Sequence, residues 1–356
     1  MRVTYLVEAP VTPTDSGYQS PLASLRYRVL LPARELARDD IEVRFVDARQ
    51  SVRFLPDGGT SESVYVVSKS FDHRTLEAAA QVKAAGHRVI VDFCDNHFAR
   101  PGIGQHFLSL AGMADEITAA TAAMADAVRE ATGRDSLVIG DPIEGPAGTP
   151  KFSPPIDELR LCWFGHNSNL DTLDPVLSGL AKRQMSGQQP LGGRRVTLEL
   201  VTALSDPLLH NLKKVQQAFA GGLTFVATQW STEATWAALK RADAVVIPSL
   251  ERGDKRVKSP NRLLESINAG RVVAGHPLPS YEMFSDYAYL GQDVWSALEE
   301  ALGDPHAALQ RVAAGQASIR RDYSTRAIAA QWRRAIDAAV SGSARPSLRR
   351  EVLGSR

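Results

Sequence analysis

The segment 242–275 constrains the fold more than any other part of the chain, because it contains a strand, a loop, a helix and a second strand in order. The apolar run 244–247 predicts a buried strand. Residues 260–269 have helical spacing and end at Gly270, a typical C-terminal cap. Residues 271–275 are again strand-like. This order predicts a βαβ unit, and therefore a parallel sheet covered by helices.

The same alternation of strands and helices fills the rest of the chain in two blocks. A segment rich in proline and glycine, 141–155, separates them and is predicted to be a linker. We therefore expect an N-terminal Rossmann-like domain over 1–145 and a second one over 156–320, followed by a helix over 321–340 and a disordered tail over 341–356. Strands are expected near 2–7, 43–46, 63–67, 87–93, 115–117 and 137–139 in the first block, and near 159–164, 196–201 and 223–227 in the second, and helices near 24–38, 75–85, 119–131 and 325–339.

Basic and polar residues gather where the loop of the βαβ unit meets its helix. In open α/β sheets, loops at the carboxyl ends of strands hold the ligand. A helix N-terminus with basic side chains favours an anion, most simply a phosphate or diphosphate. The alternative is a solvated surface loop. The candidate residues, several of them three or four positions apart and so on one helical face, are Lys255, Arg256, Lys258, Ser259, Asn261, Arg262 and Glu265.

A second candidate for anion binding follows the first predicted strand of the second block. Gly165, Asn167 and Ser168 lie between that strand and a helix, so their backbone N–H groups can line a hollow for an anion. An ordinary helix cap is the alternative, because Ser and Asn are common caps. The glycine spacing fits neither a Walker A motif nor a dinucleotide-binding fingerprint.

In the first block, polar residues follow the strand near 87–93. Asp95 and His97 are expected at the carboxyl edge of the sheet, where either can orient a substrate hydroxyl or act as a base. A structural role for His97 is the alternative. Cys94 with His97 lacks the third group of a nucleophile triad. Asp95, His97 and His106 do not form a zinc site, because Pro101 and Gly102 interrupt the spacing.

Segment 242–275 resembles the nucleotide-sugar signature of GT-B fold glycosyltransferases, in particular the group 1 (retaining) family. The matching residues are Pro248-Ser249, Asn268-Ala269-Gly270 and Val272-Val273-Ala274, and Glu265 stands where the family has the second Glu of its E-x7-E motif. The resemblance implies that Glu265 binds the ribose hydroxyls of the donor. The motif is divergent, since Val257 replaces the first Glu and Ser259-Pro260-Asn261 replaces Gly-Phe-Gly.

The resemblance implies a fold and an activity. The fold is GT-B, with two Rossmann-like domains whose parallel sheets face a central cleft and a C-terminal helix that crosses back to the first domain. The activity is transfer of a sugar from a nucleotide-diphosphate donor to an acceptor hydroxyl, with retention. Lys258 and Arg262 would offset the charge of the departing diphosphate without a metal. The loop 15–20, with Gly17 and Tyr18, and Arg26 would lie on the acceptor side.

Two other functions remain open at this stage. A GT-B nucleotide-sugar epimerase or hydrolase would share the fold and the diphosphate site. A non-catalytic GT-B-like binding protein would fit the missing first Glu. For Arg26, an ordinary surface position is the alternative to a binding role.

Composition narrows the remaining classes. The net charge of +1 gives no electrostatic case for nucleic acid. Cys94 and Cys162 are far apart in the sequence and are expected to be reduced, as in a cytoplasmic protein. No apolar stretch approaches the length of a membrane span, and no export signal is expected. We expect no cofactor beyond the nucleotide sugar, and membrane contact only if the acceptor is lipid-linked. The sugar, the base, the acceptor and the oligomeric state stay open.

Overall fold

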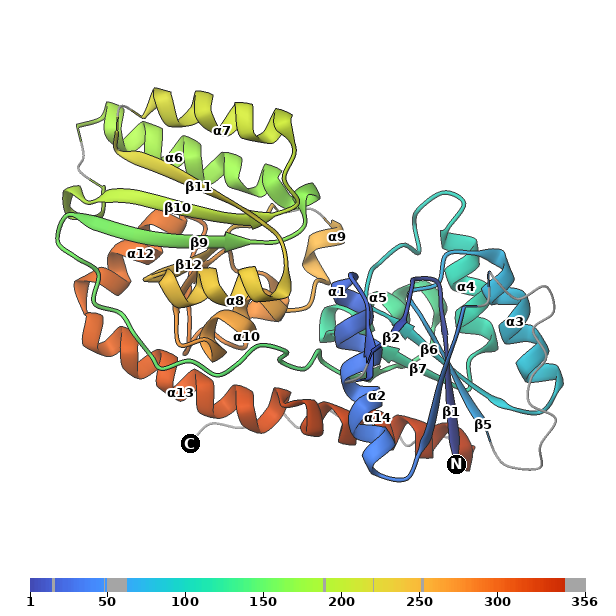
Figure 1. The fold of residues 1–356 in the computed structure, drawn as a ribbon. Coiled ribbons are helices and arrows are strands. Elements are labelled where there is room, and N and C mark those ends of the chain that lie inside the picture. Colours follow the sequence, from blue (N-terminus) through green and yellow to red (C-terminus); the bar gives the residue numbers. More distant parts are fainter. Residues whose placement is uncertain are drawn as a thin grey trace. The chain divides into compact units, whose positions relative to one another are not determined.

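The computed structural model describes residues 1–14, 17–47, 49, 63–187, 190–219, 221–250 and 253–342. The chain divides into two units. Unit 1 comprises Met1–Ile139 and the chain from Ile328 onward, and unit 2 comprises Gly140–Ala327. Each unit contains a parallel sheet with helices packed against it (Figure 1). Of the predicted disordered tail 341–356, Ser341 is the last residue of a helix, α14 (Thr325–Ser341), and the residues from 343 onward lie outside the described residues.

The sheet of unit 1 has six parallel strands in the order β4-β1-β5-β6-β7-β8. Its central strands are almost continuous runs of buried residues, as expected when helices cover both faces of a parallel sheet. In β5 every residue is buried. The strands are β1 (Arg2–Val7), β4 (Glu42–Asp47), β5 (Ser63–Ser68), β6 (Arg88–Phe93), β7 (Glu116–Ala119) and β8 (Leu137–Val138).

The helices of unit 1 begin with a broken one. The sequence predicts a single helix over 24–38, whereas the structure has α1 (Ala23–Leu25), the π-helix η1 (Arg26–Leu30) and α2 (Leu31–Arg38) in succession. A short antiparallel hairpin, β2 (Thr12–Thr14) with β3 (Gly17–Gln19), lies before them. The remaining helices are α3 (His73–Ala84), α4 (Gly104–Met113), α5 (Ala122–Thr132) and α14 (Thr325–Ser341).

A buried ion pair fixes the broken helix to the sheet. Arg28 of η1 donates from Nη2 and Nε to the two carboxylate oxygens of Asp92 in β6, at 2.6 and 3.1 Å. The same carboxylate accepts hydrogen bonds from Ser68 at 2.9 Å and Thr118 at 2.7 Å. Arg28 also donates to the carbonyl oxygen of Ile139. Its charge is therefore neutralised and hydrogen-bonded, which is the condition for burying it.

The returning helix α14 packs against the same group. The Arg28 guanidinium lies 5.5 Å from the ring centre of Trp332, a fully buried residue of α14. A cation over an indole face is stabilised by the quadrupole of the ring. The C-terminal helix thus belongs to unit 1 although it follows unit 2 in sequence.

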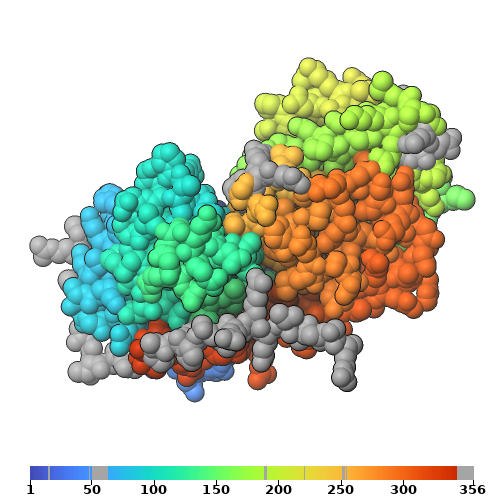
Figure 2. Space-filling model, turned by 180° about the vertical axis from the view of Figure 1, so that it is seen from behind, coloured from blue at the N-terminus to red at the C-terminus, as the bar shows by residue number. Residues whose placement is uncertain are grey.

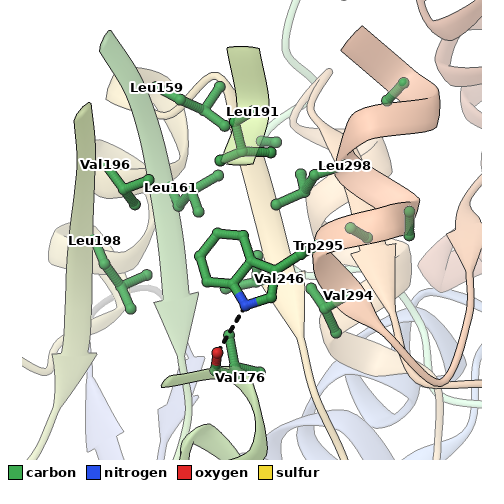
Figure 3. Close-up of a cluster of buried hydrophobic side chains, with 14 of the residues drawn as sticks. Leu159, Leu161, Val176, Leu191, Val196, Leu198, Val246, Val294, Trp295 and Leu298 are labelled. Atoms are coloured by element: carbon green, nitrogen blue, oxygen red, sulfur yellow. Dashed lines mark hydrogen bonds between the residues drawn. The ribbon is translucent and has the colours of Figure 1, made fainter. Parts of the chain in front are cut away.

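Unit 2 has a second sheet of six parallel strands, in the order β11-β10-β9-β12-β13-β14. Its core includes Trp295, whose indole nitrogen donates to the carbonyl oxygen of Val176 at 2.7 Å among Leu161, Leu198 and Val246 (Figure 3). The strands are β9 (Glu158–Phe164), β10 (Arg195–Thr202), β11 (Leu223–Gln229), β12 (Ala244–Ile247), β13 (Val272–Gly275) and β14 (Tyr289–Leu290).

Helices cover this sheet on both faces. In the space-filling view, the surface of unit 2 is green to yellow where residues before β12 lie and orange where residues after β12 lie (Figure 2). The helices are η2 (Asn167–Leu173), α6 (Asp174–Met185), η3 (Pro190–Gly193), α7 (Asp206–Ala218), α8 (Thr232–Arg241), α9 (Gly253–Arg256), α10 (Asn261–Asn268), α11 (Pro279–Glu282), α12 (Val294–Gly303) and α13 (Pro305–Tyr323).

The strand order reverses beside the first strand of each unit. In unit 1 the chain runs from β1 to β4 on one side and then to β5 on the other. In unit 2 it runs from β9 through β10 and β11, and then to β12 on the opposite side of β9. Open α/β sheets bind ligands at the carboxyl ends of the strands at such a reversal. The fold therefore directs attention to the ends of β1 and β5, and of β9 and β12.

The proline-rich segment between the sheets is bonded to unit 2. The amide of Gly148 donates to the Asn268 carbonyl at 2.9 Å, and the amide of Lys151 donates to the Gly270 carbonyl at 3.0 Å. Gly270 has φ +77°, and a Cβ there would lie 2.3 Å from the Thr149 carbonyl oxygen. Only glycine permits so close a backbone approach. The predicted linker is therefore, over this stretch, part of unit 2.

Because of the network around Arg28, substitutions of two arginines of unit 1 should change the stability of the protein by very different amounts. Arg28→Met leaves the Asp92 carboxylate buried without its cation and should reduce the free energy of unfolding by about 3–5 kcal/mol. Arg38→Met, at a side chain that is 74% exposed, should change it by less than about 0.5 kcal/mol. Urea unfolding followed by circular dichroism measures both. Equal effects of the two substitutions would show that the buried pair does not anchor this unit.

Candidate functional site

The two predicted anion-binding segments of unit 2 meet at the ends of β9 and β12. Arg262, in the first turn of α10, reaches the end of β9, where its Nη1 lies 3.5 Å from the carbonyl oxygen of Phe164. Its guanidinium stands 5.9 Å from the ring centre of Trp163. A Cβ on Gly165 would lie 3.5 Å from the same Nη1. The glycine turn thus leaves room for the guanidinium beside the strand end.

A second contact joins the same two segments. The Nζ of Lys255 donates to the side-chain oxygen of Asn169 at 2.5 Å. Lys255 belongs to α9, which follows β12, and Asn169 belongs to η2, which follows β9. Two cations from the βαβ unit are therefore held against the loop after β9. In open α/β sheets, ligands bind at such a reversal of the strand order.

The residues between these cations form one short turn. Ser259 donates from its hydroxyl to the side-chain oxygen of Asn261 at 2.5 Å, and the carbonyl oxygen of Lys258 accepts from the Ser280 hydroxyl at 2.5 Å. Pro260 is the N-cap of α10, and proline offers no side-chain acceptor to the first N–H groups of the helix. The positive end of the helix dipole therefore points out of this turn.

The loop after β9 is capped by a histidine. The Nδ1 of His166 lies 3.2 Å from the amide nitrogen of Ser168, which donates to it, and 2.9 Å from the Ser168 hydroxyl. Asn167 and Ser168 are exposed. The capping function that the sequence allows for Ser or Asn thus falls to His166, which preorganises a polar and solvent-accessible turn next to Gly165.

Glu265 lies one turn further along α10 and is buried, with 1% of its surface exposed. Its two carboxylate oxygens accept hydrogen bonds from the amides of Glu144, at 2.6 Å, and Gly145, at 3.0 Å. The structure therefore places the expected ribose ligand against the backbone of the segment that joins the two sheets.

In unit 1, Asp95 forms an ion pair that the sequence did not reveal. Its carboxylate accepts a hydrogen bond from Lys69, which follows β5. Lys69 has φ +57°, a left-handed conformation that is uncommon for a residue with a side chain and occurs often at functional sites. Both residues line a small hollow at the ends of β5 and β6. Its other lining residues are Val67, Ser70, Phe71, Val91, Asp92, Phe93, Cys94, Phe107 and Leu110.

His97 lies among aromatic rings at this hollow. Its ring meets Phe71 and Phe107 edge to face, with centroids 5.5 Å apart in both pairs. His106, which we did not assign to a site, approaches the Ser70 hydroxyl at 3.1 Å. Burial lowers the pKa of His106 and outweighs the opposite effect of Glu8. The Glu8 carboxylate accepts hydrogen bonds from the Ser70 hydroxyl at 2.7 Å, from the amides of Phe71 and Asp72 and from the Thr75 hydroxyl, whereas Asp72 is the N-cap of α3.

The other acceptor-side candidates of unit 1 lie near the hairpin. Gly17 has φ +121° in β3. Tyr18 packs edge-on against Phe45 with centroids 4.6 Å apart and remains 37% exposed. Arg26 folds back so that its Nη1 donates to the carbonyl of Ser20 at 3.3 Å. Asp15 and Ser16, from the same predicted loop, lie outside the described residues.

Neither a family model nor a curated protein matches the sequence. Solved structures do match. Anabaena Alr3699/HepE in complex with UDP aligns with a TM-score of 0.61 and 14% identity over 95% of this chain and 100% of its own. An α,α-trehalose-phosphate synthase (UDP-forming) from Burkholderia xenovorans, in complex with glucose-6-phosphate, aligns with a TM-score of 0.56 and 14% identity over 82% and 75%. S. aureus TarM aligns with a TM-score of 0.55 and 13% identity over 77% and 55%, so this chain spans about half of its length.

These neighbours have the GT-B fold. The chain has the GT-B fold. The expectation for the fold is thereby confirmed, including two Rossmann-like parallel sheets. Within the ranges given above, no helix combines the length and apolar composition needed to cross a membrane. The same residues contain no group of three His, Cys, Asp or Glu side chains placed to hold a metal ion.

Sequence reasoning missed three residues of these sites. Lys69 has no motif around it, and only its position after an apolar strand marks it. Trp163 looks like an ordinary core residue of β9, although its ring lies under Arg262. Trp236 of α8 lies beside Gly145 and Glu265, since a Cβ on Gly145 would be 2.7 Å from its ring and 2.9 Å from the Glu265 carboxylate.

The reactivity of the two cysteine thiols depends on how deeply Cys94 and Cys162 are buried. Burial raises the pKa of Cys94 to about 12 and raises that of Cys162 as well. A raised thiol pKa means that the neutral, unreactive form persists well above pH 8. Cys162 is buried, whereas Cys94 is partly exposed and lines the hollow. We expect Cys162 to stay unreacted with Ellman's reagent in the native chain at pH 8, and both thiols to react in 6 M guanidinium chloride. Rapid reaction of both thiols in the native chain would contradict this.

Proposed function

We propose that the chain is a glycosyltransferase that moves a sugar from a nucleotide-diphosphate donor to an acceptor hydroxyl. The observation that carries the proposal is the meeting of Arg262, Gly165 and the Lys255–Asn169 pair at the strand-order reversal of unit 2. Cations, a glycine turn and a helix N-terminus at one point suit a diphosphate. The GT-B fold supports the same class of reaction.

In this proposal the diphosphate is bound from two sides. Arg262 and Lys258 bind it from α10 and the turn before it, together with Asn261 and Ser259. Gly165, Asn167 and Ser168 bind it from the loop after β9. Negative charge builds up on the diphosphate as the glycosidic bond breaks, so groups that are already oriented toward it stabilise the transition state. Trp163 orients Arg262 before the donor arrives.

The rest of the donor extends along α10. The Glu265 carboxylate binds the ribose hydroxyls, as the family resemblance implies. Uridine is the base that we propose, because the structural neighbours were solved with UDP or carry a UDP-forming activity in their descriptions. In this proposal no metal is needed, because cationic side chains balance the leaving-group charge. The transfer proceeds with retention, as the family resemblance implies.

The acceptor binds to unit 1. Asp95, paired with Lys69, and His97 orient the acceptor hydroxyl at the ends of β5 and β6. Gly17, Tyr18 and Arg26 contribute to the acceptor side from the hairpin and the start of η1. In this proposal the protein acts in the cytoplasm, and it contacts a membrane only where its acceptor is lipid-linked.

A non-catalytic nucleotide-sugar binding protein is the second candidate. The observation that favours it is Val257, which is apolar and only 4% exposed, at the position where the family motif has its first Glu. This side chain offers no acceptor for a sugar hydroxyl. The two candidates differ in whether bound donor is turned over.

Replacing the proposed leaving-group cations separates catalysis from binding. Lys258→Met and Arg262→Met should each lower the transfer rate at saturating donor by about 10²–10³-fold, and donor affinity by a smaller factor, because charge accumulates in the transition state. Release of UDP from UDP-glucose, assayed with a panel of sugar acceptors in the presence of EDTA, measures the rate. Calorimetry measures donor affinity.

Lys182→Met is the matched control, since Lys182 is an exposed lysine of α6. It should leave both quantities unchanged. A loss confined to affinity in the two site variants would reduce the role of these residues to holding the nucleotide. Donor binding without turnover of any UDP-, GDP-, ADP- or TDP-sugar by the native chain would favour the binding protein.

A further inference from the structure

Gly145 stands between an aromatic ring and a carboxylate. A Cβ at this position would lie 2.7 Å from two ring atoms of Trp236 and 2.9 Å from Oε2 of Glu265. The ring and the carboxylate therefore face a common point, although they come from α8 and α10. Only a backbone without a side chain fits between them. Gly145 occupies a place that is bounded by a flat apolar surface on one side and an acceptor pair on the other.

The backbone of residues 144–145 forms one hydrogen bond to each oxygen of the Glu265 carboxylate. Two consecutive amides, of Glu144 and Gly145, donate to Oε1 and Oε2 of Glu265 at 2.6 and 3.0 Å. A vicinal diol presents two neighbouring O–H donors in the same way, one to each oxygen of a carboxylate. The amides of Glu144 and Gly145 therefore occupy the positions that the two hydroxyls of a ribose would take.

The aromatic ring supplies the second half of a nucleoside site. Trp236 is partly exposed, and an indole face stacks on planar heteroaromatic rings. A carboxylate for the ribose hydroxyls next to a ring for the base is a chemical match for a nucleoside. Glu265 also lies one turn after Arg262 on α10, so a diphosphate at Arg262 and a ribose at Glu265 fall on one helix.

We propose that Trp236 and Glu265 form a nucleoside subsite that residues 144–145 cover in the ligand-free chain. The nucleoside displaces the two amides, stacks its base on Trp236 and donates its ribose hydroxyls to Glu265. This inference rests on the proposed function, because it identifies the ligand of the same donor site. It adds Trp236 to that site and a cover formed by the chain's own backbone.

The neighbouring contacts confine the movement to a few residues. The amide of Gly148 is bonded to the Asn268 carbonyl at 2.9 Å, and Gln316 donates to the carbonyls of Gly148 and Asn268 at 2.7 and 2.8 Å. On the other side, the amide of Ile143 donates to the Tyr323 carbonyl at 2.9 Å. These bonds hold both flanks of the cover. Within the cover, the side-chain amide of Asn268 donates to the Gly145 carbonyl at 2.9 Å, and displacement of residues 144–145 must break this bond as well.

Hydrogen exchange of the cover tests the displacement directly. The amides of Glu144 and Gly145 are measured by mass spectrometry with and without saturating UDP. We expect UDP to accelerate their exchange about tenfold or more, because they lose their acceptor, while the amides of Gly148 and Lys151 stay protected. Unchanged or stronger protection at 144–145 in the presence of UDP would overturn the inference.

Binding measurements on cover variants test the competition. Glu144→Pro removes one donor to Glu265, and Gly145→Ala places a methyl group against Trp236 and Glu265. Each should loosen the cover and tighten UDP binding, by up to about tenfold for the lost hydrogen bond to a charged group. Trp236→Leu should weaken UDP binding. Lys182→Met, at an exposed position of α6, is the control and should leave UDP affinity unchanged.

The outcomes separate this inference from the proposed function. Suppose that the native chain binds UDP, and that Glu144→Pro and Gly145→Ala, both folded by circular dichroism, bind it no more tightly. The proposal of a cover would then be wrong, whereas the proposed donor site would stand. Should no UDP or UDP-sugar bind the native chain, both proposals fall.

Discussion

The contact of Arg262 with the end of β9 is the interaction on which the proposed donor site depends. It spans the strand-order reversal, joining the helix of one βαβ unit to the first strand of unit 2. Trp163 supports the guanidinium through its ring, and Gly165 leaves space for it. Without this contact, the polar loop after β9 and the start of α10 would be two separate surface features. Because of this contact, the loop after β9 and the start of α10 place positive charge and backbone N–H donors next to each other at the end of β9.

In unit 1, two carboxylates, one inside β6 and one after its end, have different roles. Asp92, inside β6, is saturated by Arg28, Ser68 and Thr118, and is therefore a structural anchor. Asp95, three residues later, lies past the strand end and pairs with Lys69 beside a hollow. The same strand thus anchors the sheet with one carboxylate and presents another at its carboxyl edge. A rigid strand that positions a reactive loop is the usual division of labour in α/β proteins.

Local sequence patterns predicted the secondary structure, which depends on neighbouring residues. They did not predict contacts between residues that lie far apart in the sequence. Strand and helix periodicity located both sheets, and the helical spacing of Arg262 and Glu265 located α10, whereas Lys258 lies in the turn before Pro260 caps that helix. The burial of Glu265 depends on the amides of Glu144 and Gly145, about 120 residues earlier, and no periodicity encodes that contact. The π-helix at Arg26–Leu30 likewise escaped prediction, because Arg28 is drawn toward a carboxylate in β6. The contacts of His97 with the rings of Phe71 and Phe107 also escaped prediction, because these phenylalanines lie far from it in the sequence.

The affinity of the chain for UDP and UMP, with and without Arg262, tests the central claim most directly. The two ligands share the base and ribose and differ in the second phosphate, which is the group that Arg262 is proposed to bind. Isothermal titration of the native chain and of Arg262→Met with both ligands isolates that contribution. The account predicts that the preference of the native chain for UDP over UMP falls by about tenfold or more in the variant, as expected for loss of a charge-assisted hydrogen bond. An unchanged preference would contradict it, because Arg262 would then make no contact with the diphosphate.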